Sequence, residues 1–209
     1  MVASSSKMLK LLYSPASPFA RKVRMAALER RVPLQLELVR VNPVNRSERL
    51  AEFNPLVKIP VLITPDGPIH DSRVICRFLD RRGEGPSLYS SETADTWEIL
   101  VLESLADGLM DAAVNLRYEL NDRPAELRWQ QWVDAQRARI HAVLRHLSGR
   151  IPQLAASHLG TLATAAALEY LDFRHPDLEW RAAWPALSDW VTDFAQTALM
   201  RETKYPASA

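Results

Sequence analysis

The chain is poor in several features, and each shortage excludes a class of protein. It has one cysteine, Cys76, in 209 residues, so no internal disulfide can form and a reducing, cytoplasmic setting is expected. No apolar run approaches the roughly 18 residues that a membrane-spanning helix requires. Its 26 basic and 25 acidic residues nearly cancel, which gives no electrostatic reason to expect nucleic acid or a membrane surface as a partner.

Histidines are also few, and they lack the spacing of a metal site. His141 and His146 are five residues apart, whereas two ligands on one helix face are usually four apart. We therefore expect no bound metal. What the chain does have is a 47% hydrophobic content, which is enough to bury one large core or two smaller ones.

The order of predicted elements divides the chain into two parts. From residue 8 to residue 82, short strands and helices alternate. Strands are predicted over 9–13, 34–39, 60–64 and 68–70, and helices over 18–27, 47–53 and from residue 72 onward. The turn Pro65-Asp66-Gly67 is predicted to join the last two strands in a hairpin. This order predicts an α/β domain with a mixed four-stranded sheet and helices on both faces.

The second part is predicted to be all-helical. A linker over 83–91 contains Gly83, Gly85 and Pro86, and the helical domain is expected over 92–203. Apolar periodicity predicts helices over 92–120, 124–147, 161–173 and 185–199. The residues predicted to face inward are Trp97, Val101, Leu105, Leu109, Ala112 and Leu116 in the first of these helices and Trp129, Trp132, Val133, Ile140, Val143, Leu144 and Leu147 in the second. Residues 1–7 are expected to be a disordered leader or a cloning remnant.

The segment that joins the first predicted strand to the first helix carries the first candidate site. Ser17 followed by Pro18 fits the N-cap and first position of a helix, because serine accepts from a backbone N–H and proline has none to leave unsatisfied. The same geometry places a hydroxyl at the positive end of a helix, where a thiolate or another anion is stabilised. On these residues alone, capping and anion binding both stay open. Cys76 lies among apolar helix residues and is expected to serve packing.

Two further features lie in the same part of the chain. Ile59-Pro60 stands at the head of a predicted strand, where a cis bond would turn the backbone of Ile59 toward an extended peptide-like ligand. Asp71-Ser72 starts the next helix. The pair can act as a cap, or it can offer a hydroxyl, a helix-end N–H and a carboxylate to a ligand with both an ammonium and a carboxylate group.

Together these motifs resemble the cytosolic glutathione transferases, and in particular their bacterial serine-type members. The resemblance is carried by Ser-Pro-Phe-x-Arg-Lys-Val at 17–23, Asn-Pro-Leu-x-Lys-Ile-Pro-Val-Leu at 54–62 and Asp-Ser-x-x-Ile at 71–75, followed by a helical half. It implies a thioredoxin-like N-terminal domain, an all-helical C-terminal domain, a homodimer, and glutathione as co-substrate at the domain interface.

The resemblance also assigns roles to residues. Ser17 corresponds to the catalytic serine, Ile59 to the residue whose backbone pairs with the cysteinyl part of glutathione, and Asp71 and Ser72 to the pair that holds its γ-glutamyl end. Lys58 is expected near the glycyl side and Phe19 at the thiol. The full set expected to bind glutathione is Phe19, Lys58, Ile59, Pro60, Asp71 and Ser72.

The second substrate is less clearly indicated. The corresponding pocket is expected around Met110, Ala113, Val114 and Arg117, which favours a small hydrophobic electrophile, although core packing explains the apolar residues equally well. A helix cap expected at Thr161 has threonine, not aspartate, three residues later. Alternatives to conjugation are a non-catalytic binding or scaffold protein of the same fold, and a glutathione-dependent isomerase or dehalogenase.

Overall fold

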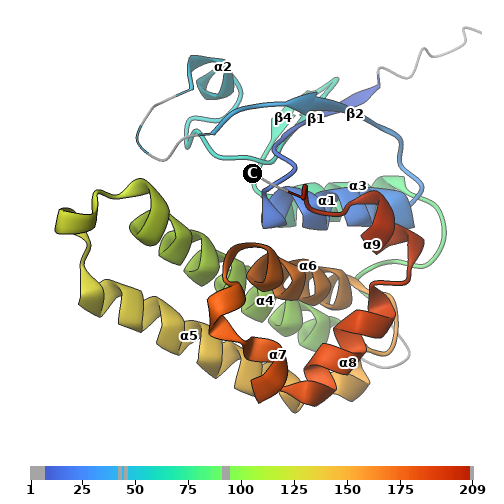
Figure 1. Cartoon of the computed structure of the whole chain (residues 1–209). Helices are drawn as coiled ribbons and strands as arrows, with labels where there is room; N and C mark the ends of the chain where they lie inside the picture. Colours follow the sequence, from blue (N-terminus) through green and yellow to red (C-terminus); the bar gives the residue numbers. More distant parts are fainter. Residues whose placement is uncertain (1–7, 42–43, 45–46, 91–94, 208–209) are drawn as a thin grey trace, which may run out of the picture. The chain divides into compact units, whose positions relative to one another are not determined.

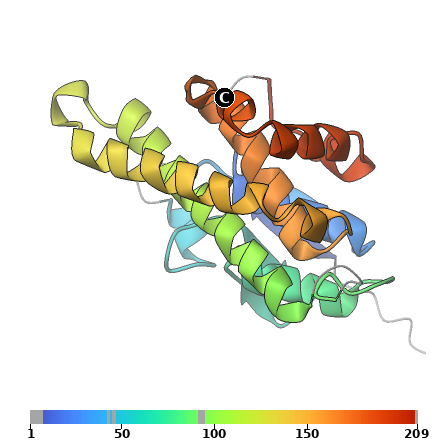
Figure 2. The same cartoon turned by 90° about the horizontal axis from the view of Figure 1, so that it is seen from below.

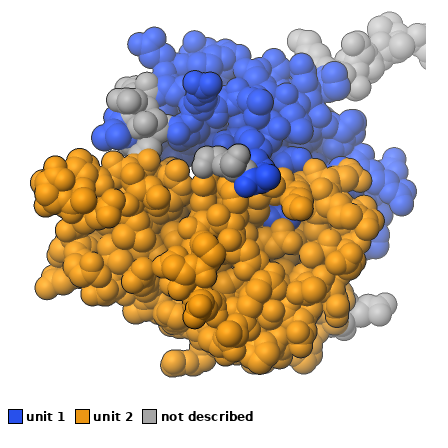
Figure 3. Space-filling view, viewed as in Figure 1, with its two compact units in different colours: residues 1–86, 206–209 blue, residues 87–205 orange. Residues whose placement is uncertain are grey.

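The computed structural model describes residues 8–41, 44, 47–90 and 95–207 (Figure 1). The chain divides into two compact units, residues 1–86 with 206–209 and residues 87–205 (Figure 3). We call them the sheet unit and the helical unit. Residues 83–86 of the expected linker belong to the sheet unit and residues 87–90 to the helical unit. The expected leader over 1–7 and the expected domain start at residue 92 lie outside the described residues.

The sheet unit contains a four-stranded mixed sheet with strand order β2-β1-β3-β4 among the residues described. β1 is parallel to β2 and antiparallel to β3, and β3 and β4 form the predicted hairpin. The mixed four-stranded sheet predicted from the sequence is confirmed. Its elements are β1 (Leu9–Tyr13), α1 (Pro18–Glu29), β2 (Leu34–Leu38), α2 (Glu48–Ala51), β3 (Val61–Thr64), β4 (Gly67–Ile69) and α3 (Ser72–Arg82).

Both faces of this sheet are covered, as predicted. Leu12 and Val61 are cross-strand partners, and they form a buried cluster with Leu50 of α2. Leu11 and Leu62 are the next partners along the ladder; they point to the opposite face because side chains alternate along a strand. That face carries α1 and α3, which pack side by side (Figure 1).

The helical unit is organised around α6. Twelve of the sixteen residues of α6 are buried, which is typical of a helix surrounded by other elements. It packs so closely on α4 at Gly160 that a side chain there would not fit: an added Cβ would lie 2.6 Å from the Leu102 Cβ. The elements are α4 (Thr96–Arg117), a π-helical turn (Tyr118–Asp122), α5 (Gln130–Ser148), α6 (Leu159–Arg174), α7 (Trp180–Ala183), α8 (Pro185–Phe194) and α9 (Ala198–Glu202), with short 3-10 turns at Ala125–Leu127, Ile151–Leu154 and Pro176–Leu178. Long α4 and α5 run side by side (Figure 2).

The predicted inward faces of two helices were right for most of their residues and wrong for three. The confirmed residues are Leu109, Ala112 and Leu116 of α4 and Val133, Ile140, Leu144 and Leu147 of α5, which are all buried. Trp97 and Val101 of α4 are 76% and 47% exposed, and Trp129 before α5 is 60% exposed. Because α4 is apolar on more than one side, its periodicity alone did not identify the whole buried stripe, which includes Ile99, Leu102, Ala106, Leu109, Ala113 and Leu116. The second long helix begins at Gln130 and not at Pro124. The last predicted helix is divided into α8 and α9.

The predicted start of the central helix was also wrong. α6 begins at Leu159, two residues before Thr161, and its N-cap is His158, whose Nδ1 accepts from the Thr161 backbone N–H at 3.2 Å. His158 is fully buried, and this burial lowers its pKa, which favours the neutral ring that can accept. Thr161 instead donates its hydroxyl to the Ala156 carbonyl at 2.7 Å. Capping rules favour serine, threonine, aspartate and asparagine, so they did not indicate a histidine.

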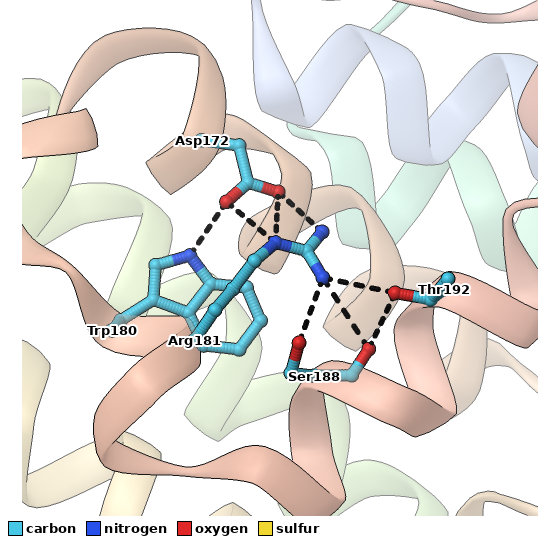
Figure 4. A network of polar contacts seen from close by, with 5 residues as sticks. All are labelled: Asp172, Trp180, Arg181, Ser188 and Thr192. Atoms are coloured by element: carbon cyan, nitrogen blue, oxygen red, sulfur yellow. Dashed lines mark hydrogen bonds and ion pairs between the residues drawn. The ribbon is translucent and has the colours of Figure 1, made fainter.

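A polar network joins the last helices of this unit to α6 (Figure 4). Asp172 of α6 accepts from the Trp180 indole at 2.8 Å and forms an ion pair with Arg181 at 2.6 Å. The same guanidinium donates to the hydroxyls of Ser188 and Thr192 on α8, both at 3.1 Å. Since one arginine holds groups on α6 and α8, it fixes the position of α7 between them.

Arg30, directly after α1, holds the end of the sheet unit together. Its side chain is 6% exposed, lies 3.2 Å from the Asp80 carboxylate and donates to the Asp80, Gly83, Gly85 and Pro86 carbonyls. Gly83 is required there, because a Cβ would lie 2.4 Å from the Arg30 Cβ. The arginine thereby attaches α3 and the segment that follows it to α1.

We predict that Arg30→Ala destabilises the protein by about 3 kcal/mol or more, because it removes the ion pair with the largely buried Asp80 carboxylate and the donor to several backbone carbonyls. The measurement is the free energy of unfolding in urea. Arg31→Ala is the matched control: the Arg31 side chain is 77% exposed and only 4.0 Å from Glu84, so a change within about 0.5 kcal/mol is expected. Equal effects of the two substitutions would contradict the structural role of Arg30.

Candidate functional site

Sheet topology brings the three predicted motifs to one end of the sheet. Leu12, near the end of β1, pairs with Val61 at the start of β3, so the segment after β1 lies beside the segment before β3. Ile69, at the end of β4, pairs with Leu62. The residues after β4 therefore lie at this end too. Ser17, Ile59-Pro60 and Asp71-Ser72 come from these three neighbouring segments.

Ser17 is the N-cap of α1, as predicted, and Pro18 is the first helical residue. Its Oγ accepts from the Ala20 backbone N–H at 3.2 Å. A hydroxyl that accepts one hydrogen bond keeps its own O–H for donation. The half-buried Ser17 hydroxyl thus stands at the positive end of a twelve-residue helix with a proton to offer an anion. Nearby, the Ser14 hydroxyl accepts from the Ala16 N–H at 3.3 Å and closes the turn.

Asn54 shapes the loop that leads to the second motif. It is 2% exposed; its Nδ2 donates to the Lys58 carbonyl at 2.7 Å, and its Oδ1 accepts from the Leu56 N–H at 3.0 Å. Between these bonds, Val57 has a φ of +53°, a left-handed conformation that costs a β-branched residue about 1–3 kcal/mol. The Asn54 bonds hold the loop in that form. Lys58 is exposed, Ile59 is half-buried, and the Ile59-Pro60 bond is cis.

We predict that Asn54→Ala lowers the free energy of unfolding by about 1–3 kcal/mol, because the loop loses both hydrogen bonds that the buried Asn54 side chain makes to its backbone. Glutathione affinity, measured by calorimetry, should also fall, since the Lys58–Ile59 backbone is no longer fixed. Asn54→Asp is a second variant. It keeps the acceptor for the Leu56 N–H but replaces the donor to Lys58 by a charged oxygen at a buried position, so it should lower the free energy of unfolding at least as much. Unchanged stability and affinity in both variants would show that the loop holds its form without Asn54.

The third motif is a helix start. Asp71 is the exposed N-cap of α3, and its Oδ1 accepts from the Arg73 N–H at 3.0 Å. Ser72, the first residue of α3, is 4% exposed. The predicted cap is confirmed. This point of the chain therefore offers a carboxylate, a hydroxyl and the N–H groups of a helix end side by side. The set suits a ligand that carries both an ammonium and a carboxylate group.

The residues predicted for a second substrate all belong to α4 in the helical unit. Met110 and Ala113 are fully buried, whereas Val114 and Arg117 are half-buried. The Ala113 carbonyl is 2.8 Å from the His175 Nε2, and Arg117 pairs with Asp122 at 2.8 Å. The role of these residues in substrate binding stays a prediction.

Sequence patterns missed two groups of residues that belong in this account. Asn54 follows the helix predicted over 47–53 and begins the 54–62 motif, but its side chain was assigned no role, although asparagine is a common loop former. Tyr170 and Arg174 at the end of α6 were missed because no local motif marks them. They come near Arg117 only through the packing of α6 on α4.

Other chemistry has little support in the part of the chain that the structure describes. Within it, no group of three or more histidine, cysteine, aspartate or glutamate side chains could hold a metal ion. None of the described helices combines the length and apolarity needed to cross a bilayer. Cys76 is buried in α3, in agreement with the packing role expected for it.

Comparisons with known proteins identify the family. The profile of the glutathione S-transferase N-terminal domain matches residues 16–82, and that of the C-terminal domain matches residues 130–193. An uncharacterised GST-like protein of Escherichia coli K12, YibF, is 30% identical over 204 residues, which cover 95% of this chain and 99% of that protein. The chain belongs to the glutathione S-transferase family.

Solved structures agree with this assignment. A glutathione transferase family member from Pseudomonas fluorescens Pf-5, with bound glutathione, is 40% identical with a TM-score of 0.92 and covers 95% of this chain and 100% of that one. A second structure from Pf-5 contains S-(propanoic acid)-glutathione and is 39% identical, with a TM-score of 0.87 over the same shares. The predicted fold, a thioredoxin-like domain followed by a helical domain, is confirmed. The serine-type subclass stays a prediction.

Proposed function

We propose that this protein is a glutathione transferase in which the Ser17 hydroxyl donates a hydrogen bond to the thiol sulfur of bound glutathione and stabilises its thiolate. A free thiol has a pKa near 8.5, so only a few per cent is nucleophilic at neutral pH. Lowering that pKa raises the fraction that attacks. The sulfur then forms a bond to an electrophilic carbon of a small, largely apolar second substrate, and the leaving group departs with its electron pair.

One observation carries this proposal: Ser17 caps α1 as an acceptor and therefore keeps a donor. Because Oγ accepts from the Ala20 N–H, its O–H cannot be consumed by that bond. The hydroxyl is only half-buried and can reach a ligand. A glutathione-bound relative at 40% identity supports glutathione as the tripeptide.

The other motif residues are proposed to hold the tripeptide in place. The Ile59 backbone can pair with the cysteinyl residue of glutathione in the manner of an added strand. Asp71 and Ser72 can bind its γ-glutamyl end, where an ammonium needs a carboxylate and a carboxylate needs helix-end donors. We assign Phe19 to the wall beside the thiol and the exposed Lys58 to the glycyl carboxylate.

Ser17→Ala is predicted to lower turnover of a generic aromatic electrophile by about ten- to a thousandfold, because the sulfur loses its donor in the reacting complex. Glutathione affinity should stay nearly unchanged, since the remaining motif residues bind the tripeptide. The measurements are steady-state turnover with glutathione in excess and calorimetric binding of glutathione.

Ser14→Ala is the matched control for this substitution, because Ser14 lies in the same turn and its hydroxyl accepts only the local Ala16 N–H. Its turnover should remain within about threefold of the original. Full turnover by the Ser17→Ala variant would contradict the role of Ser17 and would mean that another group activates the thiol. An original protein that shows no glutathione binding at millimolar concentration would instead favour a non-catalytic role for the fold.

We further propose that the protein is a homodimer that uses the exposed apolar side of α4. Trp97 and Val101 are four residues apart, so they lie on one face of that helix, and they are 76% and 47% exposed. Large aromatic residues exposed in this way are enriched at protein interfaces. A second copy of the chain is the partner that the family resemblance implies.

Trp97→Glu should weaken dimerisation at least about tenfold, because it places a charge in the centre of the apolar contact. Folding should be retained, since glutamate is favourable in the first turn of a helix. Sedimentation velocity over a range of concentrations measures the effect. Leu127→Glu, at a residue 62% exposed in a 3-10 turn, is the control; a purely monomeric original protein would contradict the proposal.

A further inference from the structure

The ends of α4 and α6 bring together arginine and aromatic side chains that the proposed glutathione site does not use. Arg117 is the last residue of α4 and Arg174 is the last residue of α6. Both are half-buried. We call this group the arginine–tyrosine cluster; it consists of Arg117, Tyr118, Tyr170, Phe173, Arg174 and Tyr205.

A contact between the two helices places the arginines near each other. The His175 ring, directly after Arg174, lies with Nε2 2.8 Å from the Ala113 carbonyl of α4. Arg117 is four residues after Ala113 and therefore one turn further along the same face. The two guanidinium groups thus come from adjacent helix ends that a buried hydrogen bond holds together.

Each of these two cations lies over one aromatic ring. The Arg174 guanidinium lies 4.0 Å over the Phe173 ring, and Phe173 stacks on Tyr205 at 5.0 Å. Tyr205 is anchored, because its hydroxyl donates to the Ala166 carbonyl at 2.9 Å. Arg117 lies 6.0 Å from the Tyr118 ring. Flat apolar surfaces therefore stand next to two positive charges.

The electrostatics of the cluster favour an anion. The pKa of Arg174 is lowered, first by burial and then by the charge of Arg117, so the neighbouring cation makes the positive charge on Arg174 more costly. Asp122 pairs with Arg117 at 2.8 Å and offsets one of these two charges. Burial raises the pKa of Tyr170 to about 12, so its phenol stays protonated. Arginine has no acceptor, so in the hydrogen bond between Arg174 and Tyr170 the phenol oxygen accepts and its O–H can donate elsewhere.

We propose that the arginine–tyrosine cluster binds a carboxylate carried by the second substrate, which is then a small electrophile with an apolar body and an anionic group. The planar forks of two guanidiniums match a carboxylate, and the phenol O–H adds a third donor. The aromatic rings suit the apolar body. The inference rests on the proposed transferase function, and it makes Arg117, Arg174 and Tyr170 the residues that select the substrate by charge.

The first test measures binding without glutathione, so that it does not depend on catalysis. The probes are 4-chloro-3-nitrobenzoate and 4-chloro-3-nitrobenzamide, which share a shape and differ in charge. Calorimetry should give a dissociation constant at least about tenfold lower for the benzoate. Arg174→Gln should remove this preference. Arg139→Gln should keep it, because Arg139 also lies over a ring, 5.5 Å from Trp132, but is exposed outside the cluster.

The second test measures turnover of the same two compounds with glutathione, each relative to its uncatalysed rate. Arg174→Gln and Arg117→Gln should each lower kcat/KM for the benzoate by about ten- to a hundredfold, and for the benzamide by less than about threefold. Arg174→Lys keeps a charge and loses the planar fork, so its kcat/KM for the benzoate should lie between the values of the original protein and of Arg174→Gln.

The outcomes separate the proposals. An arginine at a helix end also stabilises the helix dipole; if that were its only role, the glutamine variants would lower the melting temperature and affect both probes equally, which would overturn the anion site. No preference for the benzoate in the original protein would overturn it too. Charge-selective binding without any glutathione-dependent turnover would support the anion site and contradict the transferase function.

Discussion

Antiparallel pairing of β3 with both β1 and β4 is the constraint on which the candidate glutathione site depends. Because Leu12 is opposite Val61 and Leu62 is opposite Ile69, three segments that are far apart in sequence meet at one end of the sheet. A slip of one residue would turn the buried side chains of a strand to the other face. Burial of Leu11 and Leu12 on opposite faces makes such a slip costly, so the packing that stabilises the sheet also fixes the site.

At that end of the sheet, capping and proposed chemistry use the same atom. The Ser17 oxygen satisfies a backbone N–H of α1, which fixes the side chain in one orientation, and the helix end adds a positive potential. The hydroxyl proton is what remains for a ligand. A serine fits this double role because it accepts and donates at once, whereas an alanine would do neither.

Local rules predicted the parts of the fold that local interactions determine. The cap at Ser17, the hairpin between β3 and β4, and the helix start at Asp71 depend on neighbouring residues, and each was predicted from the sequence. The buried stripe of α4 was predicted only in part, because that helix has apolar residues on several sides and only its tertiary partners select one. The cap at His158 was missed because histidine is not among the residues that usually cap helices; its ring accepts here because burial lowers its pKa and favours the neutral form. The approach of Arg174 to Arg117 depends on α6 packing against α4, which no motif encodes.

The proposed role of Ser17 in a protein of this family is to lower the pKa of the thiol of bound glutathione. The most direct measurement is the ultraviolet absorbance of the thiolate as a function of pH, with glutathione bound to the original protein and to the Ser17→Ala variant. The account predicts that the bound thiol of the original protein titrates at least about one unit below the free value near 8.5, and that the variant returns it toward that value. The same pKa in both complexes would contradict the account.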